Sequence, residues 1–153
     1  MPDIFNPDFI DFLKFLNKNE VEYLLVGGYA VILHGYIRST GDMDLWVKKS
    51  KDNYLKIKKT YNDFGAPMFS ESHFLETELD VWSIGKEPSK IEILTNVDGL
   101  EFNESFKNCN WFDLEKIKIP YIYFDDLIKN KLASGRYKDL ADIEQLSKIK
   151  KDK

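Results

Sequence analysis

Two aspartates one residue apart, Asp42 and Asp44, are the residues of this chain best suited to chemistry. They lie at the start of a short apolar run, 43–47, that reads as a strand. In a strand, residues i and i+2 point to the same face and lie about 7 Å apart along the chain, so both carboxylates would converge on one point. Carboxylate oxygens are the ligands that Mg²⁺ and Mn²⁺ prefer. The pair therefore predicts a divalent-cation site in outline.

A glycine pair, Gly27-Gly28, ends an earlier apolar run and precedes a short, nearly all-apolar helix predicted over 29–34. Glycine allows the backbone to approach a ligand closely, and the N–H groups at the start of a helix favour anions. The pair is therefore expected to contact a phosphate. A phosphate beside a metal ion makes phosphoryl transfer the leading hypothesis for the function.

The composition narrows the classes of protein that this chain could represent. Its 153 residues suit one domain that buries about two-thirds of its unfolded surface, and they leave no room for a second large substrate domain. A net charge of −4 argues against a protein that coats nucleic acid non-specifically, although a local basic groove stays open. The only cysteine, Cys109, excludes an internal disulfide. Without a run near the roughly 20 apolar residues of a membrane span, we expect a cytoplasmic protein with no membrane contact.

The elements that must position these residues alternate between helices and strands, which indicates an α/β sheet that is antiparallel in part. Asn6 and Pro7 mark the start of the first helix. The stretch 103–111 is expected to be loosely ordered, and the tail 148–153 to be disordered. Helices are predicted from residue 7 and over 29–34, 52–64, 124–134 and 137–148, and strands over 22–26, 43–47, 81–84 and 91–95, the last two joined by a hairpin turn.

The glycine pair, the short helix, Arg38-x-Thr40 and Asp42-x-Asp44 together resemble the N-terminal signature of the DNA polymerase beta-like nucleotidyltransferase superfamily. The segment from Lys131 to Asp142, KLASGRYKDLAD, is similar to the last motif of its small bacterial members, including the abortive-infection type toxins. The resemblance implies a nucleotidyltransferase-type mixed sheet flanked by helices, with a C-terminal helical hairpin. It implies a single nucleotidyltransferase-like domain over 1–153, with the sheet core at about 20–122 and the C-terminal helices at about 123–148.

The activity that this resemblance implies is the metal-dependent transfer of a nucleoside monophosphate from a nucleoside triphosphate to an acceptor. Family members carry a third carboxylate on a later strand, and Glu92 is the residue that matches it. Asp42, Asp44 and Glu92 would then be the catalytic residues and would hold Mg²⁺ or Mn²⁺, with two ions expected. The implied nucleotide-binding residues are Gly27, Gly28, Arg38, Thr40, Lys131, Arg136 and Asp139. Many family members have Gly-Ser in place of Gly27-Gly28, so a hydroxyl contact to the phosphate is missing here.

Each motif also has a purely structural interpretation. The two aspartates could belong to a turn or a solvated strand edge, and Glu92 could face solvent. Lys131 borders the apolar stripe of its helix, so it is either a phosphate contact or a lysine that extends its ammonium to solvent. Arg136 and Asp139 could cap the adjoining helices. The three tryptophans are expected in the core, and only Tyr29 is a candidate for stacking on a base.

Partners and alternatives stay open at this point. The acceptor could be RNA, a protein or a small molecule, and a homodimer or a cognate partner protein is compatible with the motifs. The alternative function is a non-catalytic nucleotide-binding or toxin–antitoxin partner with the same fold, which the presence of all three carboxylates disfavours. A transferase of the antibiotic-modifying kind is disfavoured because the chain has no large acceptor domain, unless a dimer supplies one.

Overall fold

The computed structural model describes residues 5–78 and 81–151. Its strands are β1 (Tyr23–Val26), β2 (Asp42–Val47), β3 (Val81–Ile84), β4 (Lys90–Leu94), β5 (Asn110–Leu114) and β6 (Ile117–Tyr121). Its helices are α1 (Pro7–Lys18), α2 (Gly27–Leu33), α3 (Lys51–Phe64), α4 (Glu71–Glu76), α5 (Phe102–Lys107), α6 (Phe124–Ser134) and α7 (Tyr137–Lys151).

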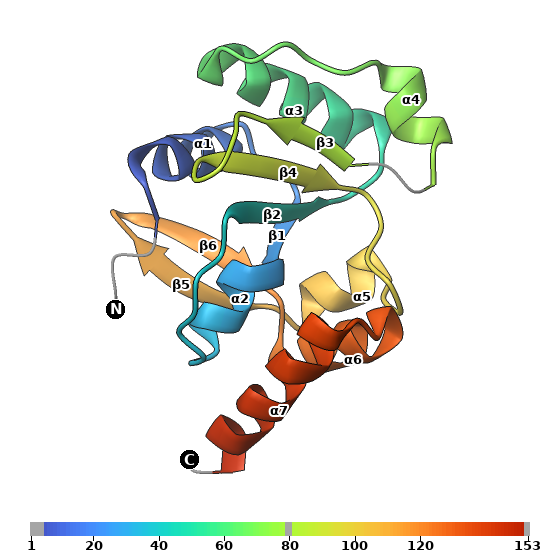
Figure 1. Ribbon diagram of the computed structural model, residues 1–153. Coiled ribbons are helices and arrows are strands. Elements are labelled where there is room, and N and C mark those ends of the chain that lie inside the picture. Colours follow the sequence, from blue (N-terminus) through green and yellow to red (C-terminus); the bar gives the residue numbers. More distant parts are fainter. Residues whose placement is uncertain (1–4, 79–80, 152–153) are drawn as a thin grey trace.

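The six strands form one mixed sheet in the order β3-β4-β2-β1-β6-β5 (Figure 1). Strand β2 lies near the middle, antiparallel to β1 and parallel to β4. Strand β3 pairs antiparallel with β4, as the hairpin turn predicts, and β5 pairs antiparallel with β6. Helices α6 and α7 contact each other. The predicted fold class, a mixed α/β sheet with two C-terminal helices, is confirmed.

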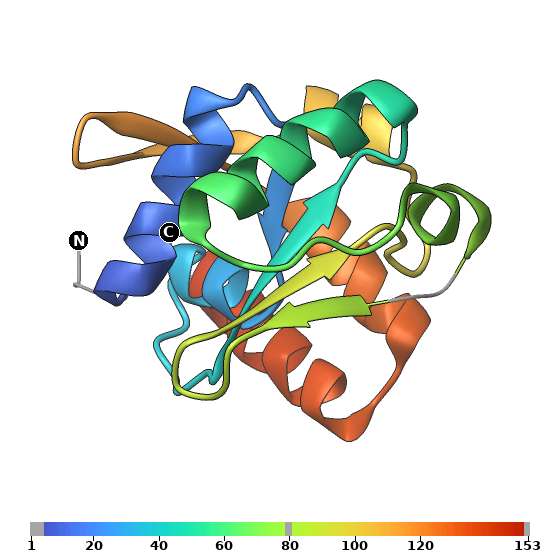
Figure 2. The same ribbon diagram turned by 90° about the horizontal axis from the view of Figure 1, so that it is seen from above.

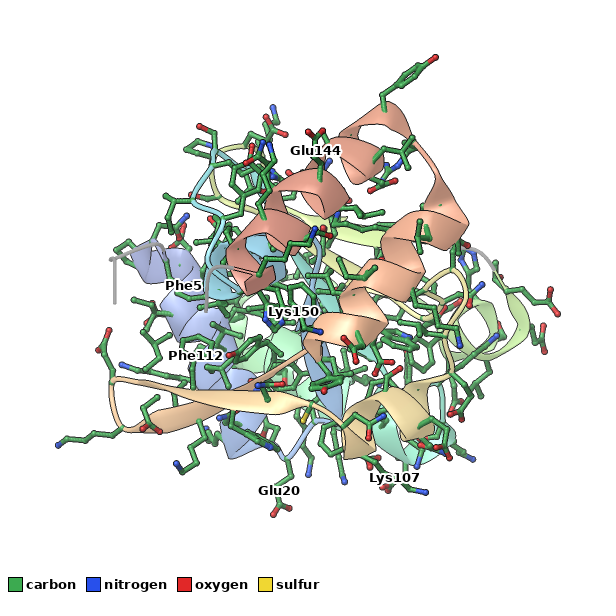
Figure 3. All side chains as sticks on the ribbon, turned by 90° about the horizontal axis from the view of Figure 1, so that it is seen from below. Phe5, Glu20, Lys107, Phe112, Glu144 and Lys150 are labelled. Carbon is green, nitrogen blue, oxygen red and sulfur yellow. The ribbon has the colours of Figure 1, made fainter. Side chains whose placement is uncertain are left out.

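The alternation of side chains along β2 divides the core into two clusters. Met43, Leu45 and Val47 pack into the larger cluster with apolar residues of α1, α3 and α4. Trp46 points the other way, into a smaller cluster with residues of α2, α6 and α7. Because side chains alternate with a period of two, Asp42 and Asp44 share the face of Trp46. Figure 2 shows α1 and α3 across one face of the sheet, and Figure 3 shows α6 and α7 side by side in front of the other, with Glu144 and Lys150 on α7.

Local signals set several helix ends. Asn6 caps α1, its Oδ1 accepting a hydrogen bond from the backbone N–H of Phe9 at 2.9 Å. Helix α3 ends at Gly65, and α6 ends at Gly135, each with a positive φ that glycine adopts readily. The break between the two C-terminal helices is therefore where the sequence predicts it.

Three expectations from the sequence are wrong. The stretch 103–111 is not loosely ordered, because it contains most of α5 and the start of β5. The tail is helical as far as Lys151, and residues 152–153 lie outside the described residues. Trp46 is buried and Trp82 is half-buried, as expected of core residues, but Trp111 is 51% exposed on β5.

Within the described residues, no helix combines the length and the apolar character that crossing a membrane requires.

Candidate active site

Three carboxylates meet on the face of the sheet that also carries Trp46, where β2 and β4 run side by side. The parallel register pairs Asp44 with Glu92, and Asp42 precedes them by two residues on the same face. One carboxylate oxygen from each of the three residues lies within 4.8 Å of the others. All three side chains are half-buried. The convergence that the sequence predicts is present in the geometry.

The carboxylates of this triad, Asp42, Asp44 and Glu92, have unmet bonding capacity. Asp42 Oδ1 and Asp44 Oδ1 are shielded from solvent and have no hydrogen-bond partner among the described residues. Burial, followed by a hydrogen bond with Glu92 and the negative charge of that residue, raises the pKa of Asp44 to about 8. Burial and the charge of Glu92 also raise the pKa of Asp42. Carboxylate oxygens that accept no hydrogen bond and repel one another are suitable ligands for a hard divalent cation.

Glycine is required at positions 27 and 28 because neighbouring side chains lie very close to the backbone there. Gly27 has a φ of +67°, and a Cβ at this position would collide with the carboxylate of Asp44. A Cβ on Gly28 would collide with the side chain of Thr40. A Gly-Ser pair would place the serine Cβ at position 28. In this protein the Thr40 hydroxyl lies close to that point. Its Oγ1 lies 3.5 Å from the backbone oxygen of Asp42, to which it donates a long hydrogen bond.

The basic residues predicted to bind nucleotide are joined to one another in an ion-pair network. Arg38 donates two hydrogen bonds to the carboxylate of Asp142, both at 2.9 Å. Lys131 Nζ lies 2.9 Å from Asp142 Oδ2 and 3.3 Å from Asp139 Oδ1. Arg136 Nε donates to Asp139 Oδ2 at 2.8 Å. This network ties the segment before β2 to both C-terminal helices.

Burial makes the network energetically important. Lys131 is only 4% exposed, so the alternative that its ammonium extends to solvent is wrong. Burial alone would raise the pKa of Asp142, but hydrogen bonds from Arg38 and Lys131 outweigh it and hold the pKa below its usual value. For Asp139, burial is likewise outweighed, here by Arg136 and Lys131, and the pKa is lowered. Both carboxylates are therefore ionised partners of buried cations.

A small pocket of about 190 Å³ connects the triad to this network. Its lining includes five residues predicted for the site, which the fold thus brings together: Gly27, Asp44, Lys131, Arg136 and Asp139. The other five predicted residues, Gly28, Arg38, Thr40, Asp42 and Glu92, do not line it. A larger groove of about 620 Å³ lies over the contact between α6 and α7 and includes none of the predicted residues.

Other residues near the site were missed or judged differently from the sequence. Asp142, the shared partner of Arg38 and Lys131, follows Asp139 by one helical turn, and that spacing is a signal that could have found it. Lys90 lies 3.0 Å from Glu92 and precedes it by two residues on the same strand face. Tyr29 is buried between Phe5 and Phe9, so its ring is not available to stack on a base.

A mixed sheet that brings three carboxylates beside a glycine turn, with two helices following, has the architecture of the nucleotidyltransferase fold. The chain belongs to a family described as nucleotidyltransferases of unknown function (DUF6036), whose model matches residues 9–151. This finding supports the resemblance at the level of the class, and the match to abortive-infection toxins stays a hypothesis.

Two solved structures are similar to this chain along nearly its whole length. One is TM1012 from Thermotoga maritima, described as a candidate nucleotidyltransferase, at 15% identity and a TM-score of 0.54, covering 93% of this chain and 88% of that one. The other is the lincosamide antibiotic adenylyltransferase LnuA with lincomycin bound, at 16% identity and a TM-score of 0.58, covering 97% and 99%. At these identities the likeness shows the fold alone. No curated protein matches the chain.

Proposed function

We propose that this protein is a metal-dependent nucleotidyltransferase that moves a nucleoside monophosphate from a nucleoside triphosphate to an acceptor. The observation that carries the proposal is the triad itself, in which two solvent-shielded carboxylate oxygens have no hydrogen-bond partner among the described residues. Structural carboxylates are normally paired when buried, as Asp139 and Asp142 are in the same protein. Asp42 Oδ1 and Asp44 Oδ1 lack such partners among the described residues, which supports a cation as their ligand.

In the proposed site, Asp42, Asp44 and Glu92 would hold two Mg²⁺ or Mn²⁺ ions. Bound there, the ions would neutralise the triphosphate and polarise the phosphorus that is attacked. Positioning and charge neutralisation contribute most to this kind of transfer, because little covalent chemistry is required of the protein. The backbone at Gly27 and Gly28 would contact the phosphates, since neither glycine has a side chain between its backbone and Asp44 or Thr40.

The bond changes are those of an in-line displacement. The acceptor oxygen bonds to the α-phosphorus, the bond from that phosphorus to the bridging oxygen breaks, and pyrophosphate leaves. The proton of the attacking hydroxyl passes to a base, for which Glu92 is the candidate because it completes the triad from β4. Arg136 lines the same small pocket as Asp44 and contributes a positive charge there. Arg38, Lys131 and Asp139 would act by holding that side of the pocket in place.

A small-molecule acceptor is a second candidate. It was disfavoured from the sequence because the chain has no large acceptor domain, but that reason does not hold. LnuA, which is named as an adenylyltransferase of lincosamide antibiotics, is matched over 99% of its chain by this one. A chain of this extent can therefore carry a fold that serves a small acceptor.

The test is transfer itself. The protein would be incubated with each of the four labelled nucleoside triphosphates, Mg²⁺ or Mn²⁺, and separate pools of RNA, protein and small-molecule acceptors. We expect label to appear in one pool, with release of pyrophosphate, and to be absent for Asp44→Asn. Nucleotide binding without transfer to any pool would favour the non-catalytic alternative, and no metal-dependent binding at all would refute the proposal.

A further inference from the structure

A lysine is built into the acidic site beside the third carboxylate. Lys90 and Glu92 are two residues apart on β4 and therefore share a face, and the register places Lys90 next to Asp42 and Glu92 next to Asp44. Lys90 Nζ lies 3.0 Å from Glu92 Oε1. The Lys90 side chain is 32% exposed and that of Glu92 is 21% exposed. The ammonium thus contacts one member of the triad directly.

The surroundings of Lys90 are acidic on more than one side. Besides its ion pair with Glu92, Lys90 is the register partner of Asp42 on β2. Glu87 comes from the turn between β3 and β4, and its carboxyl group lies against Gly41, directly before Asp42. Carboxylates from β2, from β4 and from the turn that joins β3 to β4 therefore lie around the ammonium.

We propose that Lys90 is the resident counter-cation of Glu92 and competes with a divalent ion for that carboxylate, an inference that rests on the proposed function. An oxygen that accepts a hydrogen bond from an ammonium loses that bond when it turns to a metal ion. A fixed positive charge at this distance also repels an incoming cation. Lys90 accordingly lowers the affinity of the empty triad for divalent ions and keeps Glu92 in place until one binds. Lys90 is in this sense a positioning residue.

The experiment measures Mn²⁺ affinity by electron paramagnetic resonance of the free ion, with wild type, Lys90→Met and Lys90→Gln. Removal of the ammonium is expected to tighten Mn²⁺ binding by about tenfold, because the triad gains a full unmatched negative charge. Lys90→Arg keeps the charge and should bind as the wild type does. Lys86→Met is the matched control, since Lys86 lies in the turn that precedes β4 and forms no ion pair among the described residues.

Thermal melting supplies a second readout. In EDTA, the melting temperature of Lys90→Met should be lower than that of the wild type, because Glu92 has lost its counter-cation. Adding Mn²⁺ should raise the melting temperature more in the variant than in the wild type. Equal or weaker Mn²⁺ binding by both Lys90→Met and Lys90→Gln, with wild-type binding intact, would overturn the role of Lys90 alone. Absence of Mn²⁺ binding in wild type and in both variants would overturn the inference together with the metal site of the proposed function.

Discussion

At the scale of single residues, the carboxylate of Asp44 is where function and stability conflict. It lies between Val26 of β1 and Glu92 of β4, and its Oδ1 has no hydrogen-bond partner among the described residues. A buried carboxylate beside two others destabilises the ionised, metal-free state. That cost is expected to be offset only when a cation binds.

Replacing Asp44 by Asn should therefore stabilise the metal-free protein, by about 0.5–2 kcal/mol, while it abolishes transfer. It should also shrink the Mg²⁺-induced rise in melting temperature, because a ligand stabilises in proportion to its affinity for the folded state. Paired melting curves in EDTA and in millimolar Mg²⁺ measure both effects. Asp11→Asn, at an exposed position on α1, is the control. A destabilised Asp44→Asn protein with the wild-type response to Mg²⁺ would contradict the two-metal site.

The same group predicts a pH dependence with a definite sign. The folded-state pKa of Asp44, about 8, lies above the usual value of about 4 for an aspartate in an unfolded chain. Its contribution to stability is thus fully present below about pH 4 and is lost as the pH rises toward 8. Urea unfolding of the metal-free protein between pH 5 and about 8 should show this loss. The Asp44→Asn variant should show a flatter profile; two parallel profiles would rule out the raised pKa.

The contact between Gly28 and Thr40 gives a third prediction at this scale. Gly28→Ala should destabilise the protein by about 1–3 kcal/mol, because the new Cβ collides with the Thr40 side chain. Adding Thr40→Ala should restore only part of that loss, because it removes the hydroxyl but keeps the Thr40 Cβ, which also lies too close; a double-mutant cycle in urea would measure the coupling. If the two effects simply add, Gly28 and Thr40 are not in close contact.

At the scale of elements, the ion-pair network fixes α6 and α7 against the segment that leads into β2. Removal of one partner from a buried pair is costly because the other charge stays behind. Lys131 is shared by Asp139 and Asp142, so its loss takes a buried partner from each of these carboxylates, which then keep only Arg136 and Arg38.

Lys131→Met should destabilise the protein by about 3 kcal/mol, whereas the exposed Lys129→Met on the same helix should change stability by less than about 0.5 kcal/mol. Chemical denaturation gives both values, and calorimetry with a nucleotide tests the predicted contact to phosphate. A small loss of stability combined with a large loss of nucleotide affinity would instead make Lys131 a ligand-binding residue.

At the scale of the whole molecule, charge should make nucleotide binding depend on a divalent ion. The chain carries a net charge of −4, and a triphosphate brought to the triad without a cation meets carboxylates of like sign. Nucleotide affinity measured by calorimetry should therefore fall at least about tenfold in EDTA relative to millimolar Mg²⁺. Equal affinity in the two buffers would count against the assignment of the triad.

Much of the framework was predictable from the sequence because its signals are local. Asn6 with Pro7 starts α1, Gly65 and Gly135 end α3 and α6, and strict alternation places Asp42 and Asp44 on one face of β2. Each of these depends on the conformation of a few consecutive residues. Glu92 is different, because its local pattern predicts only a strand, and its place as the third carboxylate came from the resemblance to the family.

The features that only the tertiary structure decided are contacts between residues far apart in the chain. Arg38 and Asp142 are 104 residues apart, and nothing near either residue indicates that they pair. Helix α5 has only six residues, and it is held by nonlocal packing such as that of Phe102 on Trp46. The exposure of Trp111 follows from its place on an edge strand of the sheet. The sequence by itself thus determined which residues could form a metal site. Only the fold decided which basic residues are already paired with carboxylates, because buried charges need partners that local sequence does not specify.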